Sequence, residues 1–290
     1  IFETKSLLSR QQLEGLGTLP VSSGSHEVLS WTDTWVKDCV RLYFRPKTPT
    51  QYHAEGVKSQ TFLKTSRFSD AHCPVPVFFL FDLADLLCMQ ETKFSDRGLG
   101  SHKYRILSSA DELRQLDWPK IYHNGPIDPS QDTREVTACR NAEIIVPHSL
   151  PLDALKFVYC RSEPELETLL HLLSSSVVQQ YRRRILSSTR SDLFNRHHTF
   201  LESVRLSTQS VMLSFSPETK SPGPFTLGVE FSNLTGAVVI HQQVSEFMVR
   251  TPSGTYRWEI KTPLQEYTVK IYLDEALIYA NKYINEDVPF

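Results

Sequence analysis

The sequence predicts an α+β protein of 290 residues in two parts. Helical and strand patterns are mixed from residue 1 to about 175, and every cysteine lies in that stretch. From about residue 200 onward, short strand patterns follow one another with turn residues between them. We therefore expect a mixed domain over residues 1–195 and an antiparallel β domain over residues 196–290.

The composition excludes several classes of protein. Lys and Arg total 31 against 33 Asp and Glu, so a histone-like basic coat is excluded, although a local basic groove is not. Five cysteines form no CxxC pair, which argues against a disulfide framework and fits a reducing cytoplasm. The most apolar stretch, residues 74–89, carries Asp82 and Asp85, so we expect neither a membrane span nor a membrane partner. The chain opens abruptly, which predicts that further residues precede Ile1.

Strands and helices are mixed in the first part of the chain. Apolar runs predict strands over residues 40–44, 76–81, 141–147 and 155–160. Helices are expected over residues 83–89, 109–116 and 164–181. The second of these helices opens with Ser109 three residues before Glu112, which is the capping-box pattern. Asn124-Gly125-Pro126 indicates a turn-rich loop over residues 122–134.

Residues 181–200 are rich in arginine. The stretch contains five arginines and a single acidic residue, Asp192. We interpret it as a helix end and a linker. Such a basic segment could follow a nucleic-acid backbone, or it could be a solvated helix end. The adjacent His197 and His198 are expected to face solvent rather than to bind a metal.

The remainder of the chain predicts an antiparallel sandwich. Strand candidates cover residues 204–215, 225–231, 237–244, 247–251, 255–260, 266–272 and 276–283. Turn signals such as Pro222-Gly223-Pro224 separate them. Their number and spacing indicate immunoglobulin-like architecture, and the lack of cysteine there excludes a disulfide between the sheets.

Common catalytic motifs are absent from the sequence. It holds no GxGxxG, GxxxxGK[ST], HExxH or GxSxG pattern and no spaced set of metal ligands, so we expect no metal. Three polar segments remain as candidates. They are residues 40–49, where a strand ends in a cationic turn bounded by prolines, residues 93–98, which form a polar turn, and residues 140–147.

Glu143 is the sharpest candidate in these segments. A carboxylate that begins an apolar strand after a long loop is expected at the rim of a cleft. A low dielectric there would raise its pKa and suit it to work as a base. A capping or salt-bridged carboxylate is the alternative. The turn in residues 40–49 could hold a phosphate or a ribose, or it could belong to an edge strand with solvated cations.

In their order and spacing, these segments resemble the DarT family of DNA ADP-ribosyltransferases, the toxins of DarTG-type toxin–antitoxin systems. The resemblance covers residues 1 to about 175 and runs through IFETKSLLSR, LYFRPKTP, PVFFLF, FSDRG, DELRQLDW, RNAEIIVP and PLDALKFVYC. It implies an ADP-ribosyltransferase fold, a split β core that grips NAD as the substrate. It also implies that Glu143 is catalytic and that a loop in residues 121–141 touches the acceptor. Thymine in single-stranded DNA is the acceptor that the family suggests.

The resemblance assigns further residues, with departures from the family pattern. The family's strand-turn motif, roughly YFxPRxPM, has Lys47 at its Arg position and Thr50 at its Met position. A lysine in place of the arginine replaces a planar guanidinium, which can bind an anion through two hydrogen bonds, by the compact charge of an ammonium group. The family's N-terminal His-x-Thr motif has no counterpart ahead of Ile1. Catalytic roles are expected for Glu143 and Lys47, NAD contacts for Tyr43, Phe44, Arg45, Lys47 and Thr48, and nucleic-acid contacts for Arg134, Arg140, Arg182 and Arg183.

Two other functions stay open. In the first, the same transferase acts on RNA or on protein. In the second, the chain is a decayed transferase that serves as a binding or sensor module and docks a partner through a strand edge of its C-terminal domain. Under the leading hypothesis, the chain is a cytoplasmic toxin or phage-defence effector whose partner is a protein antitoxin or chaperone.

Overall fold

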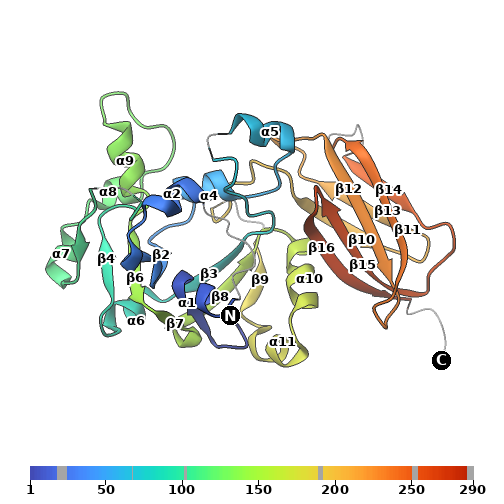
Figure 1. Ribbon diagram of the computed structural model, residues 1–290, viewed down its shortest axis with the longest axis horizontal. Helices are drawn as coiled ribbons and strands as arrows, with labels where there is room; N and C mark the ends of the chain where they lie inside the picture. The colour runs from blue at the N-terminus through green and yellow to red at the C-terminus, as the bar shows by residue number, and fades with distance from the viewer. Residues whose placement is uncertain (18–24, 67, 101–102, 189–191, 250–253, 286–290) are drawn as a thin grey trace. The chain divides into compact units, whose positions relative to one another are not determined.

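The computed structural model describes residues 1–17, 25–66, 68–100, 103–188, 192–249 and 254–285 (Figure 1). The chain divides into two compact units. The first consists of Ile1–Ala54 and Leu80–Lys156, and the second of Glu55–Phe79 and Phe157–Phe290. Residues 157–195 thus group by their contacts with the C-terminal strands, and each unit is described by itself.

The helices are short. Their bounds are α1 (Arg10–Gly15), α2 (His26–Trp31), α3 (Thr34–Lys37), α4 (Pro49–Ala54), α5 (Gln60–Thr65), α6 (Leu83–Cys88), α7 (Ala110–Arg114), α8 (Trp118–Ile121), α9 (Thr133–Cys139), α10 (Glu163–Leu172) and α11 (Ser175–Tyr181), with a 3-10 turn at Leu152–Ala154. In the described ranges, none of them has the length and the apolar character that crossing a bilayer requires.

An antiparallel sheet of order β2–β6–β4–β5 forms the centre of the first unit. Its strands are β2 (Cys39–Tyr43), β6 (Glu143–Pro147), β4 (Lys93–Ser95) and β5 (Ile106–Leu107). Ile144 and Val146 pack with Val40 and Leu86, whereas Ile145 packs with Leu99. Both faces of β6 are therefore covered, which explains its unbroken apolar run.

The N-terminal two thirds of the chain also form two smaller sheets. The strands β1 (Ser6–Leu8) and β7 (Ser149–Pro151) pair antiparallel. A three-stranded sheet has the order β3–β8–β9, with bounds Val77–Phe81, Leu155–Cys160 and Ile185–Ser187. The expected strands over residues 40–44, 76–81, 141–147 and 155–160 are confirmed to within one or two residues.

The C-terminal strands form two antiparallel sheets around one core. The first has the order β10–β11–β14, with bounds Leu201–Leu206, Ser210–Phe215 and Thr255–Glu259. The second has the order β13–β12–β15–β16, with bounds Val238–Phe247, Phe225–Ser232, Glu266–Leu273 and Ala276–Ile284. Leu213 and Trp258 of the first sheet share a hydrophobic cluster with Leu227 and Val269 of the second.

Two strand boundaries differ from the expectation. Residues 204–215 were expected as one strand, but Ser207 turns the chain by accepting the N–H of Ser210 on its hydroxyl, and β10 and β11 result. Residues 237–244 and 247–251 were expected as two strands, but β13 runs unbroken to Phe247. Residues 250 and 251 lie outside the described residues.

The helix expected over residues 164–181 is wrong as a single element. The chain leaves α10 at Leu173 and enters α11 from Ser174, and both residues have extended backbone angles. Three consecutive serines begin at Ser174. Serine hydroxyls compete for backbone hydrogen bonds and favour helix ends over helix interiors, so a break at this position is physically reasonable.

The linker expected over residues 181–200 is also wrong, because part of it is packed into the second unit. Glu55 accepts hydrogen bonds from the backbone N–H of Asn195 and Arg196, at 2.9 and 2.8 Å. Arg161 is fully buried, and its guanidinium lies 4.3 Å from the ring centre of Phe200. His198, expected to face solvent, is only 4% exposed.

We expect Ser109→Ala to destabilise α7 by about 1 kcal/mol, because the predicted capping box is present. The Ser109 hydroxyl accepts the N–H of Glu112, whose carboxylate accepts the N–H of Ser109. Faster amide exchange over residues 110–115 is the expected result. Ser108→Ala is the matched control, and equal exchange in the two variants would refute the capping role.

Candidate active site

Strand pairing places three polar side chains on one face of the central sheet. Tyr43, the last residue of β2, lies opposite Glu143, the first residue of β6. Arg41 precedes Tyr43 by two residues and therefore points to the same face. Arg41, Tyr43 and Glu143 are thus brought together where the two strands end.

The carboxylate of Glu143 is buried and only half satisfied. The residue is 3% exposed, so the expected position at an open rim is wrong. Its Oε1 accepts the N–H of Leu99 at 3.2 Å. Its Oε2 has no hydrogen-bond partner among the described residues and lies 3.6 Å from Nη1 of Arg41. A buried oxygen without a donor is rare, which marks Oε2 as a candidate ligand contact.

Burial raises the pKa of Glu143, as the sequence predicted. The positive charge of Arg41, followed by the hydrogen bond from Leu99, acts in the opposite direction. Glu143 also affects Tyr43, which keeps 40% of its surface exposed. Desolvation, followed by the charge of Glu143, raises the pKa of the Tyr43 hydroxyl to about 12. The hydroxyl of Tyr43 therefore stays protonated beside the carboxylate at neutral pH.

The polar segment at residues 93–98 supports Glu143 from the adjacent strand. Ser95 is fully buried, and its hydroxyl accepts the backbone N–H of Glu143 at 3.1 Å. A Cβ atom on Gly98 would lie 2.8 Å from Cβ of Asn141, so this position admits no side chain without movement. The segment is thus a tightly packed wall of the site. Sequence reasoning selected it as a segment but did not identify the contacts of Ser95 and Leu99.

The proline-bounded turn after β2 presents one free cation. Lys47 has a positive φ of 55°, and its N–H donates to the side chain of Gln51 at 2.5 Å. In the described part of the chain, no carboxylate pairs with its ammonium group. Thr48, in contrast, is 1% exposed, and its hydroxyl accepts the N–H of Gln51 at the start of α4. The structure therefore leaves Lys47 available to an anion and uses Thr48 as a helix cap.

Arg45 is buried against the loop that follows α8. Its Nη1 donates to the carbonyl oxygens of Ile121 and His123, at 3.1 and 2.5 Å. Its Nη2 donates to Oδ1 of Asn124 at 2.5 Å. All of these partners are neutral oxygens, and burial, followed by the nearby charge of Arg140, lowers the pKa of Arg45. Arg45 thus joins the strand-turn motif to residues 121–124.

Arg140 holds the same loop from its other end. Its Nη2 donates to the carbonyl oxygen of Gly125 at 2.8 Å and contacts Nδ1 of His123. The hydroxyl of Tyr122 donates to the carbonyl oxygen of Phe44 at 3.1 Å. The Phe44 ring packs edge-to-face on Trp118, with ring centres 5.4 Å apart, and so belongs to the core.

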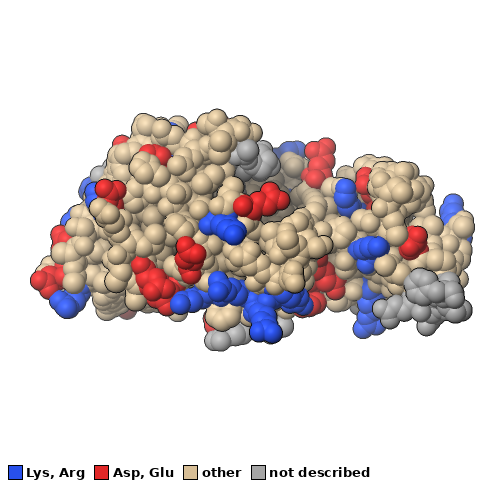
Figure 2. Space-filling view, turned by 90° about the horizontal axis from the view of Figure 1, so that it is seen from below, with Lys and Arg blue, Asp and Glu red and all other residues tan. Residues whose placement is uncertain are grey.

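The remaining candidates for nucleic-acid contact lie in both units. Arg134 is exposed on α9 in the first unit. Arg182 and Arg183 are exposed at the end of α11 in the second unit. Figure 2 shows a group of Lys and Arg side chains along one edge of the surface in that view, with Asp and Glu side chains beside them. Within the described residues, no group of three or more His, Cys, Asp or Glu side chains is placed to hold a metal ion.

The comparison with protein families decides the membership of this chain. The family model described as "ssDNA thymidine ADP-ribosyltransferase, DarT" matches residues 1–188. This chain belongs to the DarT family. The resemblance that the sequence indicated is confirmed, and the match extends beyond residue 175 through α11 and β9.

Solved structures of the DarT family are similar to this chain. Thermus sp. 2.9 DarT in complex with ADP-ribosylated ssDNA gives a TM-score of 0.50 at 19% identity, over 67% of this chain and 89% of that chain. Thermus sp. 2.9 DarT in complex with NAD+ gives 0.47 at 18% identity, over 67% and 90%. Thermosipho africanus DarTG in complex with ADP-ribose gives 0.43 at 11% identity, over 62% and 44%. No curated protein sequence matches the chain. The first of these likenesses supports a DarT fold.

We expect Arg45→Met to lower the free energy of unfolding by at least about 2 kcal/mol, because the buried carbonyl oxygens that it holds would lose a charged donor. Urea denaturation measures this change, and amide exchange over residues 121–125 localises it. Arg114→Met is the matched control, since Arg114 is exposed and, among the described residues, forms an ion pair with Asp111 alone. A loss no larger than that of the control would contradict the anchoring role.

Proposed function

We propose that this DarT-family chain transfers ADP-ribose from NAD to a thymine base in single-stranded DNA. The match of the DarT family model over residues 1–188 carries the proposal. The Thermus DarT structures with NAD+ and with ADP-ribosylated ssDNA support the same substrates. A toxin role follows from the proposal, because uncontrolled modification of DNA bases is harmful to a cell.

The proposed reaction replaces nicotinamide by a base. The bond between C1′ of the ribose and the nicotinamide nitrogen breaks, and nicotinamide leaves with the electron pair of that bond. The ribose gains oxocarbenium character, and a nearby carboxylate stabilises the growing positive charge. A ring nitrogen of thymine attacks C1′ and gives up its proton, so the base ends with one ADP-ribosyl group. A single-stranded acceptor spares the cost of opening a duplex.

Glu143 is our proposed catalytic residue. Its Oε2 is the buried oxygen without a donor, and a ribose hydroxyl would satisfy it. The ionised carboxylate would then lie beside the carbon that becomes positive and would accept the proton from the base. Because Oε2 is buried in this structure, the residues around it have to move before NAD can reach it.

Lys47 and the anchored loop are proposed to bind the two substrates. The free ammonium group of Lys47, in the place of the family's arginine, would attract the diphosphate of NAD as a point charge. Residues 121–125, held by Arg45 and Arg140, would meet the acceptor. Arg45 and Thr48 would stabilise the residues of the NAD site rather than contact NAD, because their polar groups already form hydrogen bonds within the chain. Arg134, Arg182 and Arg183 remain proposed contacts to the DNA backbone.

A DarT-like binding module without activity is the second candidate function. Two observations favour it, the closed position of Glu143 and the lysine at position 47. Calorimetric titration of the full chain with NAD separates the two candidates. A transferase binds NAD, whereas a module that has lost its NAD site gives no heat of binding. RNA offered beside DNA in the transfer assay tests the alternative acceptor.

We further propose that residues 196–290 form an immunoglobulin-like domain for partner recognition. The first, second and fifth strands form one sheet, and the other four form the second. Such a division, with a shared core, supports an immunoglobulin-like arrangement. A protein antitoxin or a chaperone is the proposed partner. The function of such a domain has to be argued from its surface rather than from its fold.

Glu143→Gln is expected to reduce transfer of labelled ADP-ribose to single-stranded DNA at least about 100-fold, because charge stabilisation of the transition state is lost. The stability of the variant at neutral pH should be equal to or higher than that of the parent, since a desolvated charge is removed. Glu91→Gln, an exposed change of the same kind, is the control. Undiminished transfer by the Glu143 variant would refute the assignment.

The acid limb of the pH–rate profile is expected to report Glu143. Lowering the pH protonates the carboxylate, and because burial raises its pKa, activity should fall at a higher pH than an exposed glutamate would give. Arg41→Gln removes the charge that lowers this pKa, so the acid limb should move to still higher pH. The profile of kcat/KM for NAD against pH measures both effects, with Arg114→Gln as the control. A limb that stays in place or moves to lower pH argues against this role.

A further inference from the structure

One pair of edges of the C-terminal sheets is covered by the chain's own helix. The helix α10 packs against the edge strands β16 and β10 (Figure 1). The backbone N–H of Ala280 on β16 donates to the hydroxyl of Thr168 at 3.1 Å. The hydroxyl of Tyr279 donates to Glu167 on the same helix at 2.6 Å. These two edges are therefore protected from other strands.

The opposite pair of edges lacks such protection. β13 and β14 end their sheets, and no described strand pairs with their outer sides. From Val238 to Ser245, β13 reads VVIHQQVS and holds no charged residue and no proline. Val238 and Val239 are 53% and 51% exposed. Natural proteins guard long edges with lysine, proline, β-bulges or a covering element. The register of β13 shifts near both of its ends, but it is regular from Ile240 to Val244, and an unguarded stretch of this kind is typical of a strand that pairs with another chain.

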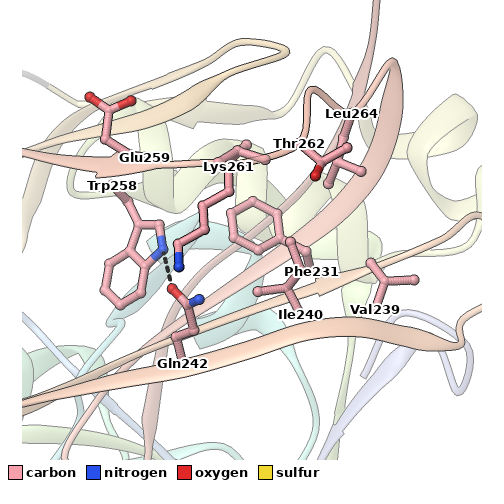
Figure 3. Close-up of a pocket in the computed structure, with 10 residues that line it drawn as sticks. Phe231, Val239, Ile240, Gln242, Trp258, Glu259, Lys261, Thr262 and Leu264 are labelled. Atoms are coloured by element: carbon pink, nitrogen blue, oxygen red, sulfur yellow. Dashed lines mark hydrogen bonds between the residues drawn. The ribbon is translucent and has the colours of Figure 1, made fainter.

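A hollow of about 370 Å³ lies between these two edge strands (Figure 3). Its wall and floor are mostly apolar and include Phe231, Ile240, Trp258 and Leu264. The indole N–H of Trp258 donates to Oε1 of Gln242 at 3.1 Å and joins the two strands across it. The volume is at the lower end of ordinary ligand pockets, about 300–1,000 Å³. It suits a few side chains rather than a large ligand.

The hollow holds one charge without a counterion. Figure 3 shows the ammonium group of Lys261 beside Gln242 and Trp258, whereas the carboxylate of Glu259 points away. Glu259 pairs instead with Arg257 at 2.6 Å. In the described part of the chain, no carboxylate lies within ion-pair distance of Lys261. An occupant that carries an acid would be complementary to this site.

We infer that the β13 edge and the adjacent hollow form a docking groove for an extended strand of a partner protein. Backbone groups of the partner would continue the sheet beyond β13. Apolar side chains on one face of that strand would fill the hollow, and an Asp or Glu would pair with Lys261. A second copy of this chain fits less well, because the one acid on its β13, Glu246, lies where the strand register shifts, next to the strand's last residue.

The test uses a displayed library of random linear 12-residue peptides, selected on the full chain. We expect the selected peptides to alternate apolar and polar residues and to contain an Asp or a Glu. A selected peptide, made synthetically, should bind at least tenfold more weakly to the Val239→Lys and Lys261→Glu variants than to the parent protein. Ile284→Lys, at a site that is 52% exposed, and Lys282→Glu are matched controls on β16 and should bind like the parent. Bound peptide should also slow amide exchange along residues 238–247.

The outcomes separate the groove from its alternatives. Failure to select any peptide overturns the inference, as does a selected peptide that binds Val239→Lys and Lys261→Glu as tightly as the parent. Binding without protection of the β13 amides overturns strand addition. A dimer in sedimentation that Val239→Lys converts to a monomer shows instead that the edge joins two copies. Transfer to DNA should be the same in all four variants, so a failed transferase assay would not affect this test.

Discussion

The carboxylate of Glu143 is the feature on which the proposed chemistry depends. One of its oxygens accepts the N–H of Leu99, and the other is buried and has no donor among the residues that the structure describes. Pairing of β2 with β6 sets its position, and Ser95 fixes its backbone. A desolvated charge with one unsatisfied oxygen costs stability, and such costs are typical of functional sites. The same burial would let the carboxylate act more strongly on a nearby positive centre than it could in water.

Two arginines, buried Arg45 and partly buried Arg140, give the site its second constraint. Arg45 and Arg140 donate to backbone carbonyl oxygens of residues 121–125 rather than to carboxylates. Their charges are therefore not neutralised by the chain, and with Lys47 they make this part of the first unit electropositive. Both proposed substrates are anionic, so the arrangement would attract them. Arg45 also connects the turn after β2 to the proposed acceptor loop by hydrogen bonds.

Local patterns in the sequence predicted much of the fold but little of the site's inner contacts. The strand at Glu143 and the capping box at Ser109 depend on neighbours along the chain, and both are confirmed. The direction of the Glu143 pKa shift is also confirmed, although burial by distant segments causes it. The partners of Arg45 in residues 121–124 lie more than 70 residues away, and no local signal identifies them. For the same reason the burial of His198 was missed, because distant segments such as the helix around Phe62 enclose it.

The most direct test of the account is the identity of the modified nucleoside. The purified chain is incubated with NAD and two single-stranded oligonucleotides that differ only in one thymine, and the products are digested and weighed by mass spectrometry. The account predicts thymidine carrying one ADP-ribosyl group from the first oligonucleotide and no modified nucleoside from the second. An unmodified first oligonucleotide, or ADP-ribose on another base, would contradict it.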